Sequence, residues 1–460
     1  MAMNVVCIGS GYVGSVTAAA FAALGHRVTV VDRDESKVKL LATGRSPIYE
    51  PGLEPLIQQM RSAGRLQAEN HYGSVATADA VFIAVGTPSR PNGTADLTFV
   101  EAAARSIGQQ LSRTRFTVVV NKSTVPVGTA DAVASILEET SGLTDGEHFA
   151  VVSNPEFLRE GYAVEDVFFP DRIVIGSRHP GALAVMKELY RPVLERKGYG
   201  RIMQWVGLDQ QKRRPVTVYF ETDAKSAELI KYASNAFLSV KISYINEIAR
   251  LCEGLGANVL DVAEGMGLDS RIGKKFLQVS SGWSGSCFPK DTAELLAVSR
   301  KYKCELGLVR TAIESNLAMH DFCIDKLCRR LTTLNGKRIG ILGLTFKPNT
   351  DDARQTQASY IIRKLMDMGA KVAVHDPQGM EMFRTLHPDW PLVYCDKPEE
   401  VGRRADGILL LTHWEDYTRL NWKAIRAVMR TPYVLDTRNF LRNLGLSGLG
   451  FQYEGIGLRA

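Results

Sequence analysis

A glycine pattern near the start of the chain constrains the fold more than any other feature. The apolar run MNVVCI predicts a buried strand over residues 3–8, and the pattern GSGYVG follows at residues 9–14. Small residues then predict a helix, and a second strand, predicted over residues 26–32, ends at Asp32. A strand, a G-x-G-x-x-G turn, a helix and a second strand predict the first unit of a parallel, doubly wound α/β domain.

Each glycine of this pattern has a physical role in a dinucleotide site. Gly9 permits the tight turn, Gly11 lets the backbone approach a pyrophosphate, and Gly14 permits close contact between helix and strand. The pyrophosphate would bind N–H groups at the start of the helix. Asp32, 18 residues after Gly14, is placed to bind a ribose 2′-hydroxyl and to repel the 2′-phosphate of NADP. The pattern predicts NAD as the cofactor; a glycine-rich turn without a ligand is the alternative.

The whole chain divides into three predicted domains. Short Val- and Ile-rich runs alternate with helical patterns over residues 1–208, as in parallel βαβ units. Residues 209–330 are mostly helical and contain one helix of about 30 residues that begins near Thr222. Residues 331–460 return to the α/β rhythm. The predicted fold class is α/β, with two Rossmann-like doubly wound domains joined by a long central helix and a helical middle domain.

Composition excludes several classes of function. Seven cysteines with no C-x-x-C pair argue against a disulfide framework and a zinc site, so we expect no metal. We expect a cytoplasmic protein without a membrane span, because no apolar run is long enough and the first residues lack the basic start of a signal peptide. The net charge of +6 is best explained as a mild surplus spread over the surface, although it also suits an anionic small-molecule substrate; no basic-aromatic motif indicates nucleic acid. The one dense basic cluster, QQKRRP at residues 210–215, predicts an exposed loop.

Cys287 lies in the small-residue stretch SSGWSGSCFPKDTAEL, residues 280–295. A thiolate is the reactive form of cysteine, and a nearby cation such as Lys290 favours it. Such a thiol can attack a carbonyl and form a covalent adduct. Combined with a hydride acceptor, it would oxidise an aldehyde through a thiohemiacetal and a thioester to an acid. A packing cysteine is the alternative.

Three further polar residues are placed for chemistry. Lys231 and Asn235 lie four residues apart on the predicted long helix, so both face the same way. Thr124 follows a predicted strand of the first domain, at the edge where cofactors bind. Taken singly, Lys231 and Asn235 are better explained as surface residues.

The segment SNPEFLREG predicts the start of a helix. Asn154 is expected at the N-cap, followed by proline at the first helical position. Glu156 and Glu160 would then share one helix face, either for base chemistry or to favour the helix dipole. In the last domain, Lys347 and Arg354 follow a strand, where they would either meet phosphates or be ordinary loop charges.

With these residues identified, the chain resembles the UDP-glucose 6-dehydrogenase family of nucleotide-sugar dehydrogenases. The resemblance covers nearly the whole chain, and so many motifs in one order are more specific than any one of them. The motifs are GxGYVG, SPIYEPGLE, VGTPS, KSTVPVGT, NPEFLREG, ELIKYASNAFL, SRIGKKFL, GSCFPKDT and LGLTFKPNTDDAR.

The resemblance implies a reaction in which UDP-glucose, two NAD⁺ and water give UDP-glucuronate and two NADH. It implies that Cys287 is the nucleophile of the second oxidation and that Lys231 and Asn235 steady the oxyanion. Asp291 and Thr124 would assist a water network, and Glu156 would assist thioester hydrolysis. A homodimer built around the long helix is also implied, with Arg271 reaching the neighbouring subunit's site.

The resemblance also assigns binding residues. The expected cofactor contacts, which include the glycine pattern, are Gly9, Gly11, Tyr12, Val13, Gly14, Asp32, Lys37, Thr87, Thr124, Glu160, Lys290 and Arg354. The expected substrate contacts are Glu156, Phe157, Leu158, Arg159, Glu160, Lys231, Asn235, Arg271, Phe276, Leu277, Gln278, Val279, Ser280, Ser284, Lys347 and Arg438.

Two segments depart from the family pattern. Ser284 stands where the family loop has a glycine whose backbone meets the sugar, and Gln355-Thr356 stands where the family has Glu-Ser. The stretch at residues 209–216 looks like an insertion without an assigned role.

Three alternatives stay open at this point. A GDP-mannose 6-dehydrogenase, or another nucleotide-sugar 6-dehydrogenase, would use the same chemistry on a different substrate. A β-hydroxyacid dehydrogenase would take one hydride and need no cysteine. A nucleotide-binding protein without catalysis would produce no NADH.

Overall fold

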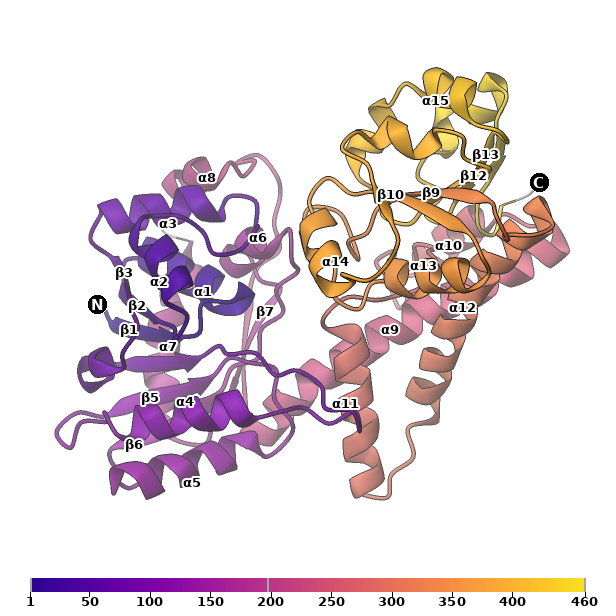
Figure 1. Ribbon diagram of the computed structural model, residues 1–460. Coiled ribbons are helices and arrows are strands. Elements are labelled where there is room, and N and C mark those ends of the chain that lie inside the picture. The colour runs from indigo at the N-terminus through magenta and orange to yellow at the C-terminus, as the bar shows by residue number, and fades with distance from the viewer. Residues whose placement is uncertain (1, 197, 459–460) are drawn as a thin grey trace. The chain divides into compact units, whose positions relative to one another are not determined.

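The computed structural model describes residues 2–196 and 198–458. The chain forms two compact units that divide between Ala233 and Ser234, within the long helix α9 (Ala224–Leu255) (Figure 1). The 32 residues of α9 span roughly 48 Å at 1.5 Å per residue, so the predicted long helix is confirmed. Within the described residues, no helix is both long and apolar enough to cross a membrane.

The described part of the first unit contains one eight-stranded sheet with the order β3-β2-β1-β4-β5-β6-β7-β8. All neighbouring strands are parallel except β6 and β7. The order reverses at β1, so the carboxyl ends of β1 and β4 border the crevice where doubly wound folds bind dinucleotides. The strands are β1 Asn4–Ile8, β2 Arg27–Val31, β3 Leu66–Glu69, β4 Ala80–Ile83, β5 Thr117–Asn121, β6 Phe149–Ser153, β7 Arg172–Gly176 and β8 Val218–Thr222.

Helices cover both faces of this sheet, because alternate side chains of a strand point to opposite faces. Val5 and Cys7 of β1 pack into the core that includes α1 and α3, whereas Val6 and Ile8 pack into the core that includes α4 and α5. The helices of this unit before α9 are α1 Tyr12–Ala23, α2 Glu35–Ala42, α3 Leu53–Ser62, α4 Thr98–Gly108, α5 Thr129–Ser141, α6 Ala163–Phe168, α7 Pro180–Glu195 and α8 Tyr199–Val206.

The second unit contains a parallel six-stranded sheet with the order β11-β10-β9-β12-β13-β14 among its described residues. This order repeats that of β3 to β6 in the first unit, so the predicted class with two Rossmann-like sheets is confirmed. The strands are β9 Arg338–Leu342, β10 Lys371–His375, β11 Val393–Tyr394, β12 Gly407–Leu410, β13 Tyr433–Asp436 and β14 Gln452–Glu454. The helices after α9 are α10 Val259–Gly267, α11 Phe288–Lys301, α12 Gly307–Leu331, α13 Gln357–Asp367, α14 Met380–Leu386 and α15 Trp422–Val428.

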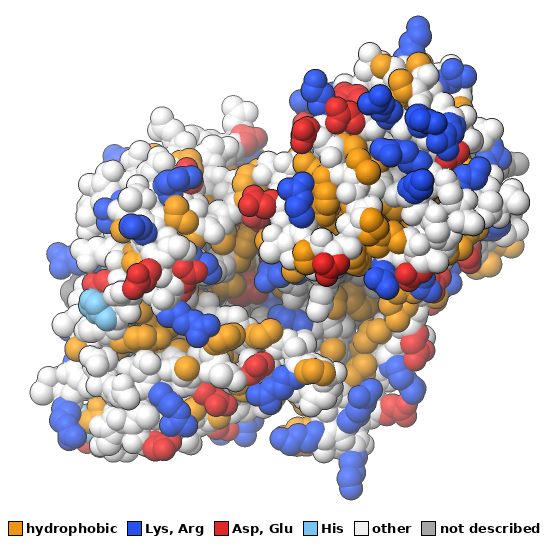
Figure 2. All heavy atoms as spheres, viewed as in Figure 1, with side chains coloured by type: hydrophobic (Ala, Val, Ile, Leu, Met, Phe, Trp, Pro, Cys, Tyr) orange, Lys and Arg blue, Asp and Glu red, His pale blue; other side chains and the backbone are white. Residues whose placement is uncertain are grey.

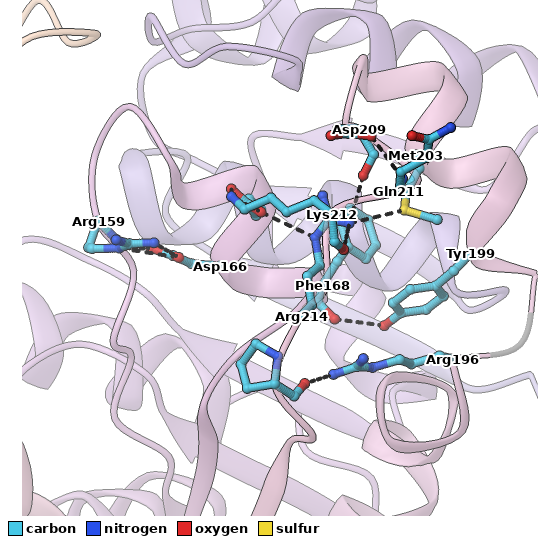
Figure 3. Close-up of polar contacts among 12 residues, drawn as sticks. Arg159, Asp166, Phe168, Arg196, Tyr199, Met203, Asp209, Gln211, Lys212 and Arg214 are labelled. Atoms are coloured by element: carbon cyan, nitrogen blue, oxygen red, sulfur yellow. Dashed lines mark hydrogen bonds and ion pairs between the residues drawn. The ribbon is translucent and has the colours of Figure 1, made fainter. Parts of the chain in front are cut away.

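The basic stretch at residues 210–215 is tied to the first unit by ion pairs (Figure 3). Lys212 Nζ and Arg214 Nε both contact Glu165 Oε1 of α6, at 2.8 and 3.1 Å. The guanidinium of Arg214 lies 4.2 Å from the ring centroid of Phe169, and its side chain is only 5% exposed. The expectation of an exposed loop is therefore wrong for Arg214, which anchors the stretch through Glu165 to α6.

Candidate active site

The glycine turn between β1 and α1 has the space that a dinucleotide needs. An added Cβ at Gly14 would lie 1.9 Å from the carbonyl oxygen of Gly9, so this position cannot carry a side chain. An added Cβ at Gly11, by contrast, would meet nothing within 4 Å among the described residues. This leaves room beside the helix N-terminus for a pyrophosphate, so the residues at this turn fit NAD.

Asp32 follows β2, and its carboxylate is held beside the glycine turn. Asp32 Oδ2 accepts hydrogen bonds from the backbone N–H and the hydroxyl of Ser10, at 2.7 and 2.6 Å, and Oδ1 accepts one from the N–H of Asp34 at 2.9 Å. Burial alone would raise the pKa of Asp32, but these hydrogen bonds and the charge of Lys37 hold the pKa below its ordinary value. Asp32 is therefore an anion at neutral pH, and a carboxylate at this position would repel a 2′-phosphate.

A buried ion pair joins two predicted site residues of the first unit. Lys231 Nζ on α9 lies 2.9 Å from Glu156 Oε1, and Glu156 Oε2 accepts a 2.6 Å hydrogen bond from the N–H of Leu158. Burial raises the pKa of Glu156, but the ammonium of Lys231, with help from Lys122, holds the pKa below its ordinary value. The pair therefore keeps a carboxylate and an ammonium charged in the protein interior.

The segment SNPEFLREG differs from the helix start that its sequence predicts. It has no helical structure, and α6 begins only at Ala163. The side-chain oxygen of Asn154 accepts a hydrogen bond from Lys122 Nζ at 3.1 Å instead of capping a helix. The predicted helix start is wrong, and Glu156 and Glu160 do not share a helix face.

Lys122 and Glu228 are buried charged residues of the first unit that the sequence did not single out. Burial lowers the pKa of Lys122 to about 8. Glu228 accepts hydrogen bonds from the N–H of Gly128 at 2.7 Å and the hydroxyl of Ser153 at 3.0 Å, and burial raises its pKa. Glu228 and Lys231 line a small pocket whose other lining residues are Asn121, Ser123, Thr124, Val125, Ser153 and Pro155. The only signal for Lys122 was its place directly after β5 in the motif KSTVPVGT.

Glu50, from the motif SPIYEPGLE, holds the loop that carries Glu156. Its carboxylate accepts hydrogen bonds from the hydroxyl of Tyr12 at 2.5 Å and from the N–H groups of Gly161 and Ala163 at 2.6 and 2.7 Å. Burial and the charge of Glu50 raise the pKa of Tyr12, with a smaller contribution from Glu160, so Tyr12 is a neutral donor. Glu50 thus links the glycine turn to the start of α6.

Thr87 and Thr124 come together in the first unit, as two predicted cofactor contacts should. The hydroxyl of Thr87, in the loop after β4, donates to the carbonyl oxygen of Thr124, after β5, at 2.9 Å. Both loops follow carboxyl ends of parallel strands, which is the edge where this fold binds its cofactor.

In the second unit, Cys287 occupies the N-cap position of α11, at the positive end of the helix dipole. Asp291, one turn later, is buried and accepts a 2.6 Å hydrogen bond from Asn235 Nδ2 at Oδ2. Lys290 Nζ lies 2.5 Å from the other oxygen of Asp291. The structure therefore joins the predicted residue Asn235 of α9 to Lys290 and Asp291 of α11, the helix that Cys287 begins.

Side chains of α12 clamp the loop before Cys287. The side-chain amide of Asn316 accepts from the N–H of Trp283 at 2.7 Å and donates to its carbonyl oxygen at 2.9 Å. The ring of His320 contacts the carbonyl oxygen of Ser281 at 2.5 Å, and burial lowers the pKa of His320. A Cβ added at Gly282, where φ is +122°, would lie 2.6 Å from His320 Cε1. Sequence reasoning missed this clamp, because its residues are distant from the motif along the chain.

The two departures from the family pattern contact the same segment of the second unit. The hydroxyl of Ser284 donates to Gln357 Oε1, and the N–H of Gly285 donates to the carbonyl oxygen of Gln355 at 3.0 Å. The hydroxyl of Thr356 caps α13. Ser284 therefore directs its side chain to the start of α13.

The predicted substrate segment at residues 276–280 is largely part of the core. Leu277 and Val279 are buried in the cluster that includes α9 and α12. The N–H of Ser280 donates to Asn246 Oδ1 at 3.0 Å. Any substrate contact by Leu277 or Val279 would therefore use backbone groups.

The remaining predicted cations of the second unit lie in different settings. Arg438 Nε donates to the carbonyl oxygen of Leu411 at 2.8 Å, and burial lowers the pKa of Arg438 to about 10. Arg354 makes two 2.8 Å hydrogen bonds to Asp352. Lys347 Nζ lies 5.2 Å from the ring centroid of Phe346. Arg271 is exposed over 87% of its side chain and pairs with the nearby Asp269, so it is not joined to the cluster around Cys287.

Comparison with known proteins connects these features. The chain matches the models of three domains of one protein family. These are the NAD binding domain over residues 3–194, the central domain over residues 225–318 and the UDP binding domain over residues 340–443. The chain belongs to the UDP-glucose/GDP-mannose dehydrogenase family. The resemblance inferred from the sequence motifs is confirmed.

Members of the UDP-glucose/GDP-mannose dehydrogenase family match over their full length. The chain is 44% identical to a UDP-glucose 6-dehydrogenase of Rhizobium meliloti (strain 1021), covering 99% of each chain. It is 39% identical to one of Bacillus subtilis (strain 168), covering 100% of this chain and 98% of that one. A solved UDP-glucose dehydrogenase from Pyrobaculum islandicum is 38% identical, with a TM-score of 0.87 over 100% of this chain and 98% of that chain.

Proposed function

We propose that this protein is an NAD-dependent UDP-glucose 6-dehydrogenase that converts UDP-glucose to UDP-glucuronate. The observation that carries the proposal is Cys287 at the N-terminus of α11, next to the Asn235–Asp291 cluster, in a chain 44% identical to a UDP-glucose 6-dehydrogenase over its full length. The cytoplasm is the expected compartment, because a reducing environment keeps the Cys287 thiol reactive.

The reaction is a four-electron oxidation of the sugar C6 alcohol in two steps. The glycine turn and Asp32 would hold NAD⁺, which when bound would supply the acceptor for one hydride in each step. In the first step the alcohol loses a hydride from C6 and its hydroxyl proton, and an aldehyde forms. Lys231, an ammonium held by Glu156 at 2.9 Å, is a donor that would stabilise the alkoxide from which the hydride leaves.

In the second step, the sulfur of Cys287 bonds to the aldehyde carbon and gives a thiohemiacetal. Loss of a second hydride from that carbon and of the proton from its hydroxyl group leaves a thioester. Water then adds to the thioester carbonyl, the carbon–sulfur bond breaks, and the carboxylate and the Cys287 thiol are released. Asn235, held by Asp291, would donate to the oxyanion, and Glu156, already an anion, would accept a proton from the water.

A substrate panel tests this proposal. NADH absorbance would be followed with UDP-glucose, UDP-galactose, UDP-N-acetylglucosamine and GDP-mannose in turn, at equal concentrations. We expect the highest kcat/KM with UDP-glucose. Turnover of GDP-mannose with none of UDP-glucose would overturn the substrate assignment, and no NADH from any of the four would overturn the assignment as an enzyme.

We also propose that two copies associate through the second-unit part of α9. Phe237, Tyr244 and Leu251 are 64%, 48% and 56% exposed. Their spacing of seven residues places them on one helix face, as in helix–helix interfaces. Sedimentation velocity should give a dimer for the unmodified chain and a monomer for the Phe237→Glu/Leu251→Glu double variant. A monomeric unmodified chain would contradict the proposal.

A further inference from the structure

A basic pocket lies at the amino-terminal edge of the second sheet. We call it the amino-edge pocket, and its volume is about 510 Å³. The residues that line it are Gly336, Arg338, Lys371, Arg403, Arg404 and Arg430. All six lie just before or at the first residues of β9, β10, β12 and β13. Nucleotides in doubly wound sheets bind at the opposite, carboxyl edge, so this pocket is separate from the UDP site that the family fold predicts.

The charge of the amino-edge pocket is mostly uncompensated. Among the lining cations, Arg430 forms an ion pair with the carboxylate of Asp406, at 3.4 Å from Nη1. The carboxylate of Asp406 also lies 3.9 Å from Lys337 Nζ. The side chains of Arg338, Lys371, Arg403 and Arg404 make no ion pair within the described residues. Figure 2 shows Lys and Arg side chains gathered on the part of this unit that carries α15, which ends two residues before Arg430.

Two residues of the amino-edge pocket, Arg338 and Arg404, are in unfavourable settings without a ligand. Arg338 Nε is buried and has no hydrogen-bond partner among the described residues, although a buried donor without a partner is unfavourable. Arg404 has a φ of +56°, in the left-handed region that disfavours residues other than glycine. Backbone strain of this kind is concentrated at functional sites.

We propose that the amino-edge pocket binds a small anion with two or more phosphate groups. A planar guanidinium donates two parallel hydrogen bonds to phosphate oxygens, and the pocket contains four guanidinium groups. One phosphate would leave most of these cations uncompensated. The volume lies in the range of pockets that hold nucleotide-sized ligands. The anion is either a nucleoside polyphosphate or a free oligophosphate, since both supply the same chemistry.

Titration calorimetry with tripolyphosphate tests this site in the full-length protein. UDP-glucose and NADH would be present at saturation, so that the substrate and cofactor sites are filled without turnover. The pocket variant is Lys371→Gln/Arg404→Gly, because Lys371 is exposed and glycine suits the backbone at Arg404. The control is Arg300→Gln/Lys301→Gln, which removes the same charge from two exposed residues at the end of α11.

We expect tripolyphosphate to bind the unmodified protein, with an affinity at least tenfold weaker in the pocket variant and changed less than twofold in the control. Arg403→Gln, a single exposed substitution, repeats the test if the double variant does not fold. ATP binding more tightly than tripolyphosphate would identify a nucleotide as the ligand, and equal affinity would identify a free oligophosphate. No binding at about 1 mM tripolyphosphate, which corresponds to a binding free energy of about −4 kcal/mol, would overturn the proposal. Equal weakening in both variants would also overturn it.

Discussion

Replacing Lys231 with methionine should destabilise the first unit by about 3–5 kcal/mol at pH 7, because it leaves a buried carboxylate uncompensated. Lys231 Nζ lies 2.9 Å from Glu156 Oε1, and both side chains are buried. After the substitution Glu156 would keep the hydrogen bond from the N–H of Leu158 and the more distant charge of Lys122. These contacts make the lower half of that range the expected result.

The pH dependence separates this effect from simple loss of packing. In the unmodified protein the pKa of Glu156 is held below its ordinary value of 4.5, so its stabilising contribution is present above that pH and lost as the pH falls through the lowered pKa. Without Lys231, burial should raise the pKa of Glu156. As the pH falls from 7 to 5, protonation of Glu156 then removes the uncompensated charge in Lys231→Met. The loss of stability of this variant relative to the unmodified protein should therefore become smaller.

The assay is hydrogen exchange at the amides of residues 225–233, which reports the free energy of opening the start of α9. Lys225→Met is the control on the same helix. Lys225 pairs with Asp131 at 3.1 Å, but the two side chains are 62% and 69% exposed. Lys225→Met should therefore lower the stability by at most about 1 kcal/mol. The explanation would be refuted if Lys231→Met lost no more stability than Lys225→Met. It would also be refuted if the loss for Lys231→Met stayed constant from pH 7 to 5.

Three other predictions follow from single residues. The pKa of Lys122 is lowered from 10.5 to about 8, so between these pH values the unfolded chain binds more protons than the folded chain. The free energy of unfolding should therefore rise by about 3 kcal/mol from pH 8 to 10.5. Urea unfolding of Lys122→Met should lack this rise, and an equal rise in both proteins would contradict the prediction. Gly282→Ala places a Cβ 2.6 Å from His320 and should lower stability by about 2 kcal/mol or more; an unchanged Tm would show that the loop is not clamped. Asp32→Asn removes the negative charge beside the glycine turn, so kcat/KM should fall for NAD⁺ and rise for NADP⁺; unchanged cofactor preference in initial-rate assays would remove Asp32 from the ribose site.

The fold was predictable where its determinants are local. The strand before Gly9, the glycine turn and the helix after Gly14 lie within one short segment, and each obeys a simple rule of backbone geometry. The strand order of both sheets then follows from repeated βαβ connections. The same locality made Lys231 and Asn235 predictable as neighbours on one helix.

Long-range contacts decided what the sequence did not reveal. Asn154 has the residue type of an N-cap, but Lys122, 32 residues away, takes its side-chain oxygen. Arg214 belongs to a charged run, yet Glu165 and the ring of Phe169 bury it. The amino-edge pocket collects cations from four separate strand starts, so only the sheet topology brings them together.

The central claim is that Cys287 carries the substrate through the second oxidation. The most direct test counts the NADH formed for each UDP-glucose consumed, with Cys304→Ser as a control at an exposed cysteine of the same unit. We predict two NADH and one UDP-glucuronate for the unmodified protein and for Cys304→Ser, and no UDP-glucuronate for Cys287→Ser. One NADH per UDP-glucose in the unmodified protein, or UDP-glucuronate formed by Cys287→Ser at the unmodified rate, would contradict the claim.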